Sequence, residues 1–234
     1  MNTVFKFYYQ AWTLLALSAA AALMWLIPAV LTKWKDRTSI AWQIILAVLV
    51  FGVLLYPVTA TQDKITDRMS TETPKTLDGM AYMKTSFYND QETVFDLNQD
   101  YDTIKWMQAN VEGSPVILEG NCVEYRWCNR FTINTGLPGI LGWNWHQRQQ
   151  RGYLSTNEIY NRLDSITMFY TTSDIDQAMN FLATYDVKYI IVGQLEKAYY
   201  PGDGMNKFAS YDGIYWKEVF RTGDTVVYEV IPQP

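Results

Sequence analysis

The stretch RFTINTGLPGILGWNWHQRQQRG, residues 130–152, is the segment around which we expect the rest of the chain to be organised. It holds His146, the only histidine of the chain, together with two tryptophans, four glycines and three arginines. Its apolar residues follow neither the helical nor the strand period, which predicts a long irregular connection. Such connections in compact domains are usually functional or disordered, and disordered segments are poor in aromatic residues. The stretch therefore predicts a functional site.

Two long uncharged runs precede this stretch, at residues 10–31 and 40–61. Each is long enough to cross a hydrocarbon core of about 30 Å, which takes about 20 helical residues. Aromatic residues that commonly anchor a span at the membrane interface lie near the ends of these runs: Trp25, Trp34, Trp42 and Tyr56. We therefore predict a transmembrane hairpin over residues 1–61. The alternative is a cleaved signal peptide with its cleavage region at 19–22, although the run is long for one and a second run follows at once.

The short loop between the runs, residues 32–39, is basic. It carries Lys33, Lys35 and Arg37 against the single acid Asp36. Short loops rich in Lys and Arg stay on the cytoplasmic side of a membrane. The pattern therefore predicts a two-pass protein of the cell membrane, with the N-terminus and the whole C-terminal part outside.

Charge changes sign along the chain. The first 60 residues contain four basic residues and one acidic residue, whereas the remainder contains 15 basic and 23 acidic residues. The net charges are therefore +3 and −8. Binding to nucleic acid requires clustered Lys and Arg that neutralise phosphates, so the acidic outer part is a poor candidate for it. Its charge also favours a position above an anionic lipid surface rather than flat against it.

The outer part divides into a polar segment and a patterned one. Residues 62–99 show little periodicity, and we interpret them as a linker packed on the outer domain. A tether without fixed structure is the alternative for the first half of this segment. Residues 100–234 show helix and strand patterns in alternation, which predict an α/β domain. The expected fold is a two-helix transmembrane hairpin followed by an extracytoplasmic α/β domain with a C-terminal β-hairpin.

Three helices are expected in this domain. Asp102 is a candidate N-cap for the first, whose apolar face holds Ile104, Met107 and Val111. Ser155 and Glu158 form a capping-box pattern for the second helix. Ser173 or Asp174 starts the third.

Four strands are expected. Residues 115–119 and 187–192 are short apolar runs bounded by Pro or Gly, as is typical of buried strands. Residues 215–220 and 225–231 are rich in strand-forming residues and are joined by RTGD, which predicts an antiparallel hairpin that closes the sheet. The segment 194–211 is interpreted as a surface loop with a short helix.

The chain has two cysteines, Cys122 and Cys128, both in the outer part. In an oxidising compartment this pair can form a disulfide that closes a small loop. Two free thiols are the alternative, because spacing alone does not establish the approach that a disulfide needs. Two cysteines and one histidine fall short of the four ligands of a structural zinc site, so we expect neither a metal nor a cofactor.

No complete catalytic signature is present: the sequence lacks a P-loop, a GxGxxG motif, a GxSxG elbow and an HExxH motif. The candidates for catalysis are His146, which can carry a proton near neutral pH, and Glu119, which ends a predicted strand at the edge where α/β folds bind ligands. The alternative for His146 is that it fixes the loop through hydrogen bonds.

Five further residues are candidates for ligand binding: Arg130, Trp143, Trp145, Arg148 and Arg151. Tryptophan rings can stack on a sugar or a lipid head group, and a guanidinium presents a fork of donors to phosphate oxygens. The alternatives are that the tryptophans anchor the loop by packing and that the arginines lie on an ordinary solvated helical turn.

Four segments together resemble the C-terminal part of the YYY family of polytopic membrane proteins: NTVFKFYYQAW (2–12), PVILEG (115–120), TGLPGILGWNWHQRQQRG (135–152) and VKYIIVGQLEKAYY (187–200). That family looks distantly related to the GT-C glycosyltransferases, which use polyprenyl-phosphate sugars on the outer face of a membrane. The resemblance places these residues on family-like positions: Glu119, Arg130, Gly142, Trp143, His146, Arg151 and Gly152. Gln147 departs from the acidic residue expected there.

The resemblance covers the tail of that family without its catalytic front, because GT-C enzymes carry their acidic centre among many spans and this chain has two. We therefore expect a non-catalytic accessory subunit of a membrane complex, in contact with the lipid bilayer and a polytopic partner protein. The alternatives are the C-terminal half of a split GT-C-like glycosyltransferase that uses polyprenyl-phosphate sugars, and a lipid-sugar binding module. Two helices enclose no cavity, so an enzyme that acts alone is the least favoured hypothesis.

Overall fold

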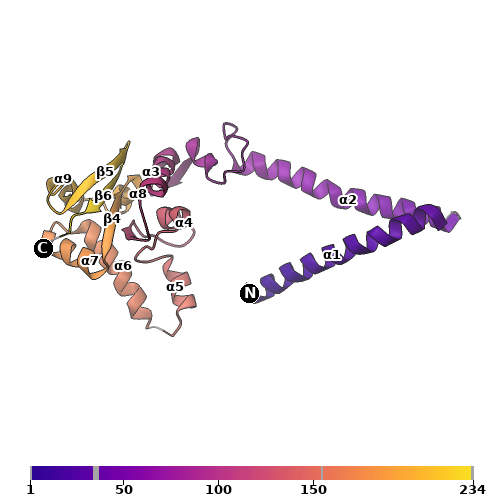
Figure 1. The fold of residues 1–234 in the computed structure, drawn as a ribbon, viewed down its shortest axis with the longest axis horizontal. Coiled ribbons are helices and arrows are strands. Elements are labelled where there is room, and N and C mark those ends of the chain that lie inside the picture. The colour runs from indigo at the N-terminus through magenta and orange to yellow at the C-terminus, as the bar shows by residue number, and fades with distance from the viewer. Residues whose placement is uncertain (1, 34–36, 154, 233–234) are drawn as a thin grey trace. The chain divides into compact units, whose positions relative to one another are not determined.

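The computed structural model describes residues 2–33, 37–153 and 155–232. The chain forms two compact units, Met1–Arg68 and Met69–Pro234, both drawn in Figure 1.

The first unit consists of two long helices, α1 (Asn2–Lys33) and α2 (Arg37–Arg68). Both are long and apolar enough to cross a membrane, and 6% and 0% of their most apolar windows are buried within the chain. The prediction of two long apolar helices is confirmed. Each helix has 32 residues and so extends beyond its predicted span, because polar residues continue the helical hydrogen bonding past the apolar run. The middle of the predicted cytoplasmic loop, residues 34–36, lies outside the described residues.

The second unit is a mixed α/β domain. In chain order, its elements up to residue 184 are η1 (Ala81–Lys84), β1 (Phe87–Asp90), β2 (Thr93–Asp96), α3 (Leu97–Asn110), β3 (Val116–Leu118), α4 (Arg130–Thr135), α5 (Asn144–Gln150), α6 (Thr156–Thr171) and α7 (Ile175–Thr184). The remaining elements are β4 (Val187–Val192), α8 (Gln194–Tyr199), η2 (Asp203–Asn206), α9 (Lys207–Ser210), β5 (Trp216–Thr222) and β6 (Thr225–Val230).

A four-stranded sheet organises this domain, in the order β3-β4-β6-β5. Strand β3 pairs with β4 in parallel, whereas β4 with β6 and β6 with β5 are antiparallel. The predicted C-terminal hairpin is confirmed as β5 and β6, and the predicted buried strands are β3 and β4. A separate two-stranded sheet is formed by β1 and β2.

Alternation along the strands divides the core into two layers. Ile117 and Ile191 pack on one side of the sheet with Ile104 and Met107 of α3. Their neighbours in sequence face the other side, where Leu118, Ile190 and Val192 pack with α6 and α7. Successive side chains of a strand point to opposite faces, so a strand buried on both sides reads as a continuous apolar run. This explains the buried run of residues 190–192 at the end of β4, whereas Lys188 near its start is exposed.

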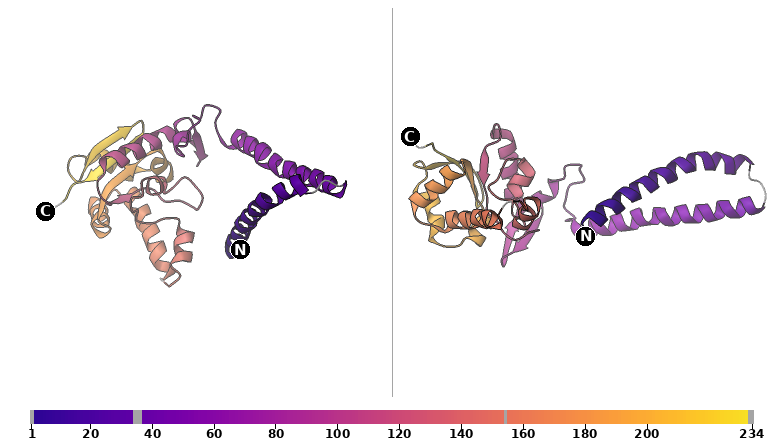
Figure 2. Two further views of the ribbon diagram at one scale, coloured as in Figure 1. Left: turned by 45° about the vertical axis from the view of Figure 1, so that its right-hand side comes forward. Right: turned by 90° about the horizontal axis from the view of Figure 1, so that it is seen from below.

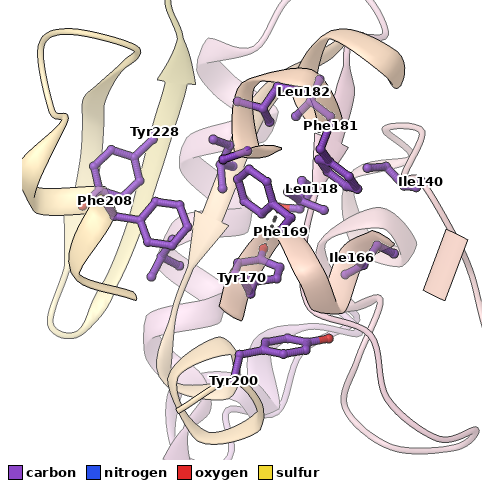
Figure 3. Close-up of a cluster of buried hydrophobic side chains, with 14 of the residues drawn as sticks. Leu118, Ile140, Ile166, Phe169, Tyr170, Phe181, Leu182, Tyr200, Phe208 and Tyr228 are labelled. Atoms are coloured by element: carbon purple, nitrogen blue, oxygen red, sulfur yellow. Dashed lines mark hydrogen bonds between the residues drawn. The ribbon is translucent and has the colours of Figure 1, made fainter. Parts of the chain in front are cut away.

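The larger core layer is aromatic (Figure 3). Tyr170 stacks on Tyr200 with ring centroids 4.8 Å apart, and Phe169 lies 4.9 Å from Phe181. The Tyr170 hydroxyl donates to the backbone oxygen of Ile191 at 2.8 Å, which satisfies its one polar group inside the core. The α6 helix is thereby fixed against the sheet.

Local capping chemistry predicted two helix starts correctly and one wrongly. Ser155 accepts a hydrogen bond from the N–H of Asn157, and Asp174 accepts from Asp176 and Gln177, as N-caps of α6 and α7. The first helix, α3, is capped by Asp96 instead of Asp102. Asp96 is the N-cap because it ends β2 in an extended conformation and its carboxylate accepts a hydrogen bond from the N–H of Asn98, whereas Asp102 lies inside the helix.

Two segments carry more regular structure than their composition indicates. The predicted linker, residues 62–99, contains the end of α2, η1 and the β1-β2 hairpin, and α3 begins within it. The predicted surface loop, residues 194–211, contains α8, η2 and α9, with Leu195 and Glu196 buried. Neither segment shows a clear hydrophobic period, because the elements that lie wholly within them are only four to six residues long.

Candidate functional site

The stretch 130–152 is more regular than expected. It begins with α4 and ends with α5, and residues 136–143 connect them. Gly139 in this connection forms an isolated parallel bridge with Ile117 and so adds to the edge of the sheet. The expectation of one irregular loop was wrong, because helices of six and seven residues are too short to show a helical period.

Arg130 lies at the centre of a buried group of charges, and its residue surface is 2% exposed. Its Nε donates to Asp100 Oδ2 at 2.9 Å. Its two terminal nitrogens donate to the two carboxylate oxygens of Glu196 at 3.1 and 3.0 Å. A carboxylate oxygen of Glu119 lies 3.9 Å from Nη1. We call these four residues the ion cluster; they join α3, the end of β3, α4 and α8.

Glu119 holds the start of α4. One carboxylate oxygen accepts from the N–H of Phe131 at 3.0 Å, and the other accepts from the N–H and the hydroxyl of Thr132 at 2.8 and 2.6 Å. These are the backbone groups that a helix leaves without partners in its first turn. Both carboxylate oxygens of Glu119 therefore accept hydrogen bonds from the protein itself.

Glu196 is enclosed by two glycines. The N–H of Gly120 donates to its Oε1 at 2.8 Å and the N–H of Gly193 donates to its Oε2 at 2.9 Å. A Cβ at Gly193 would lie 3.2 Å from Glu196 Oε2 and 3.3 Å from Arg130 Nη2. Glycine is required here because the backbone comes directly against the ion pair.

Burial and charge act on these carboxylates in opposite directions. Burial raises the pKa of Asp100 and the pKa of Glu119, and the nearby Arg130 only partly offsets it. Burial also acts to raise the pKa of Glu196, but Arg130 and the two glycine N–H groups outweigh it and lower that pKa. Glu196 is therefore the carboxylate that most firmly balances the charge of Arg130.

Two of the candidate residues are thus placed inside the domain. Arg130 and Glu119 are both buried and both engaged by neighbouring protein groups, away from solvent. A ligand would have to displace the ion pairs to reach them, which is strongly unfavourable for buried charges. Their geometry fits a structural role, and the catalytic role of Glu119 and the ligand-binding role of Arg130 stay predictions.

The other candidates lie together at α5. His146 packs against Trp143 with ring centroids 5.4 Å apart and against Tyr125 at 5.5 Å. Its Nε2 lies 3.4 Å from the Tyr125 hydroxyl. The side chain is half-buried. It is held by rings and a long hydrogen bond, and among the described residues no carboxylate hydrogen-bonds to it, as the orientation of a general base would need.

Arg148 lies between two aromatic rings. Its guanidinium carbon is 5.0 Å from the ring centroid of Trp145 and 5.0 Å from that of Tyr160 in α6. Its Nη2 donates to Asn144 Oδ1 at 3.1 Å. Arg151 follows α5 as its C-cap and is exposed. The structure therefore brings Trp143, Trp145, His146 and Arg148 together and leaves Arg151 at their rim.

A disulfide links Cys122 to Cys128 and closes the loop that carries Tyr125. Their Cα atoms are 5.9 Å apart, within the range that a disulfide requires. Two other residues of this loop reach outward: Glu124 accepts from the N–H of Trp145 at 2.6 Å, and Trp127 donates to Asp100 at 2.6 Å. The loop therefore contacts both α5 and the ion cluster.

Sequence reasoning missed four residues of these two groups: Asp100, Glu196, Glu124 and Tyr125. Glu196 carried a usable signal, since a Glu three residues after Gly193 matches the second half of a capping box. Asp100 lies at helical spacing with Ile104 and Met107, but only a helix that starts at residue 97 shows this. The two loop residues carried no signal. In the described ranges, no three His, Cys, Asp or Glu side chains gather in a way that could hold a metal ion.

Comparisons with known proteins do not assign a family to this chain. No protein-family model matches the chain, and no curated protein matches it. The resemblance to the YYY family therefore stays a prediction. Among solved structures, the C-terminal globular domain of oligosaccharyltransferase from Archaeoglobus fulgidus is similar over 56% of this chain and 96% of that chain, with 11% identity and a TM-score of 0.37. At this level, the similarity assigns neither a family nor an activity to the chain.

Proposed function

We propose that this chain is a non-catalytic accessory subunit of a membrane complex. Helices α1 and α2 anchor it in the cell membrane, with its N-terminus and its α/β domain outside, and the chain packs against a polytopic partner protein. The observation that carries the proposal is the pairing within the ion cluster. Arg130 and Glu119, the candidates with the strongest charge chemistry, are buried and engaged by the fold, so they stabilise the domain rather than turn over a substrate.

The two helices support the need for a partner. Their most apolar windows are 6% and 0% buried within the chain, so almost all of their side chains are available to lipid or to other helices. Helices in a bilayer associate through close packing rather than through the hydrophobic effect. The basic loop at 32–39 supports the orientation with the domain outside.

A second candidate function is sugar transfer with a polyprenyl-phosphate sugar, as the C-terminal half of a split enzyme, or binding of such a lipid-sugar. The residues around α5 favour it, because Trp145 is half exposed and Arg148 lies beside it. An exposed indole next to a guanidinium can stack on a sugar and attract a phosphate.

The test is to isolate the full chain from its native membrane in a mild detergent and measure the mass and composition of the particle. We expect a polytopic protein in fixed ratio, and its loss when residues 1–61 are replaced by an unrelated two-helix hairpin. A stable monomer from native membranes would contradict the proposal.

A second measurement separates the two candidate functions. The isolated complex is supplied with polyprenyl-phosphate sugars, with and without the substitution His146→Ala. An accessory subunit predicts that any transfer activity of the complex is unchanged by the substitution. Loss of transfer with an intact complex would instead favour catalysis at α5.

A further inference from the structure

Exposed aromatic residues gather at one end of the outer domain. Helices α5 and α6 form a hairpin that projects there (Figure 1 and the left view of Figure 2). Around it, Tyr125 is 76% exposed, Trp145 50%, Tyr153 85% and Tyr160 41%. We call these four residues, together with Arg148, the α5 face. Trp, Tyr and Arg are the residue types that dominate binding energy in protein interfaces.

Contacts within the domain hold three residues of the α5 face. Arg148 is fixed between the rings of Trp145 and Tyr160 and by its hydrogen bond to Asn144. The backbone of Trp145 is fixed by the Glu124 carboxylate. Tyr125 lies in the loop that the disulfide closes. Binding to a rigid surface loses less side-chain entropy, so affinity per unit area is higher.

Two nitrogens at the α5 face have no hydrogen-bond partner within the described chain. They are Arg148 Nε and His146 Nδ1, and both are shielded from solvent. Most buried polar atoms in native proteins are paired, so an unpaired one requires an explanation. For Arg148 Nε, which always donates, a partner that supplies an oxygen acceptor provides one, with a small shift of the side chain.

The charge near the α5 face contrasts with the rest of the outer part. Arg148 lies on it, Arg151 follows α5 directly, and Glu124 is the acid that contacts it, whereas Arg126 of the disulfide loop pairs with Asp90 at 3.6 Å. The chain after residue 60 carries a net charge of −8. A local excess of arginine on an acidic domain complements a partner with carboxylates.

We propose that the α5 face docks a segment of the partner protein that combines aromatic or aliphatic side chains with Asp and Glu. This inference rests on the proposed function as a subunit, and it names the surface and the chemistry of the contact. The apolar part of the segment covers Tyr153 and Trp145, and a carboxylate reaches the guanidinium of Arg148.

The test uses a photocrosslinking amino acid in the full chain in native membranes. It is placed at Tyr153 on the α5 face and, as a matched control, at Phe87, which is 66% exposed on β1. A third site at Leu15 in α1 reports contacts of the membrane helices. We expect a protein adduct from position 153 and none from position 87. Sequencing of the adduct by mass spectrometry should identify a partner peptide that contains Asp or Glu beside apolar residues.

Substitutions then test the chemistry of the contact. We expect Trp145→Ala and Arg148→Gln each to reduce the yield of the 153 adduct by about tenfold, as central interface residues do. Raising the salt from about 0.05 M to about 0.5 M should also reduce it, because charge contacts are screened. The controls Phe87→Ala and Lys188→Gln, which change an exposed aromatic and an exposed charge elsewhere, should leave the yield unchanged.

The remaining outcomes overturn the inference in distinguishable ways. A protein adduct from Leu15 but none from 153 rejects the docking role of the α5 face and leaves the accessory-subunit proposal standing. No protein adduct from any of the three sites rejects both. An adduct of 153 with lipid, or with a second copy of this chain, rejects the acidic partner protein as the occupant.

Discussion

Arg130 and Arg148 lie in the same stretch of sequence, but the structure uses them in opposite ways. Arg130 is 2% exposed and contacts three carboxylates from three other parts of the domain. Arg148 is half-buried, makes one hydrogen bond to a neighbour on its own helix and lies between two rings. A guanidinium becomes part of the fold when distant carboxylates converge on it. Without them it remains available to a partner.

The largest expected difference between the two arginines is in stability. The substitution Arg130→Met leaves the carboxylates of the ion cluster without their counter-charge, and we expect it to cost about 3–5 kcal/mol. Arg148→Met should cost less than about 1 kcal/mol, because its packing is retained and no buried charge is uncovered. Thermal unfolding of the full chain in detergent, followed by near-UV circular dichroism, measures both. Equal effects would remove the distinction between the two regions.

The close approach of the backbone to the ion cluster should be the next most sensitive feature. We expect Gly193→Ala to cost about 1–3 kcal/mol, because its Cβ would lie 2.9 Å from Thr225 Oγ1 and 3.2 Å from Glu196 Oε2. Gly79→Ala is the matched control, since nothing lies within 4 Å of its added Cβ. The midpoint of chemical denaturation should fall for the first variant only. An unchanged denaturation midpoint for Gly193→Ala would mean that the ion cluster can shift to accommodate the added methyl group.

The disulfide loop connects the two regions and can show which one depends on it. Replacing both Cys122 and Cys128 by Ser opens a short loop, which should cost about 2 kcal/mol. Compared with the wild type, we expect amide hydrogen exchange in this variant to speed up more at α5 than at α4. Glu124 and Tyr125 lose their fixed positions, whereas the partners of Arg130 lie outside the loop. Faster exchange at α4 would show that the ion cluster depends on the loop more than the α5 face does.

The smallest expected effect is on the pH dependence of stability. The pKa of Glu196 is lowered from 4.5 in the folded chain, so its contribution is present above about pH 4.5 and is lost as the pH falls through the folded pKa. Glu196→Gln lacks this contribution. The difference in melting temperature between wild type and variant should therefore narrow between about pH 7 and pH 3. An exposed control, Glu112→Gln, should follow the wild-type profile at every pH. A constant difference for Glu196→Gln would contradict the assignment of Glu196 as the main counter-charge.

Local signals in the sequence were sufficient for much of the fold. The helices α1 and α2 follow from uncharged runs alone, since length and apolarity determine which segments can cross a bilayer. The caps Ser155 and Asp174 and the strand β4 follow from residues next to one another in the chain. In contrast, the cap at Asp96 and the short elements between residues 81 and 96 depend on packing that no local pattern records.

The sequence by itself determined that arginine and aromatic side chains are concentrated in residues 130–152. Only the tertiary structure decided that Arg130 is internal and Arg148 is not. The two carboxylates that Arg130 hydrogen-bonds are 30 and 66 residues away in the chain, and their approach depends on how α3 and α8 pack on the sheet. A charged side chain that loses its water on folding must be paired inside the domain, whereas one that keeps access to water can still bind a partner. How much water a side chain loses depends on the packing of the whole domain and not on its neighbours in sequence.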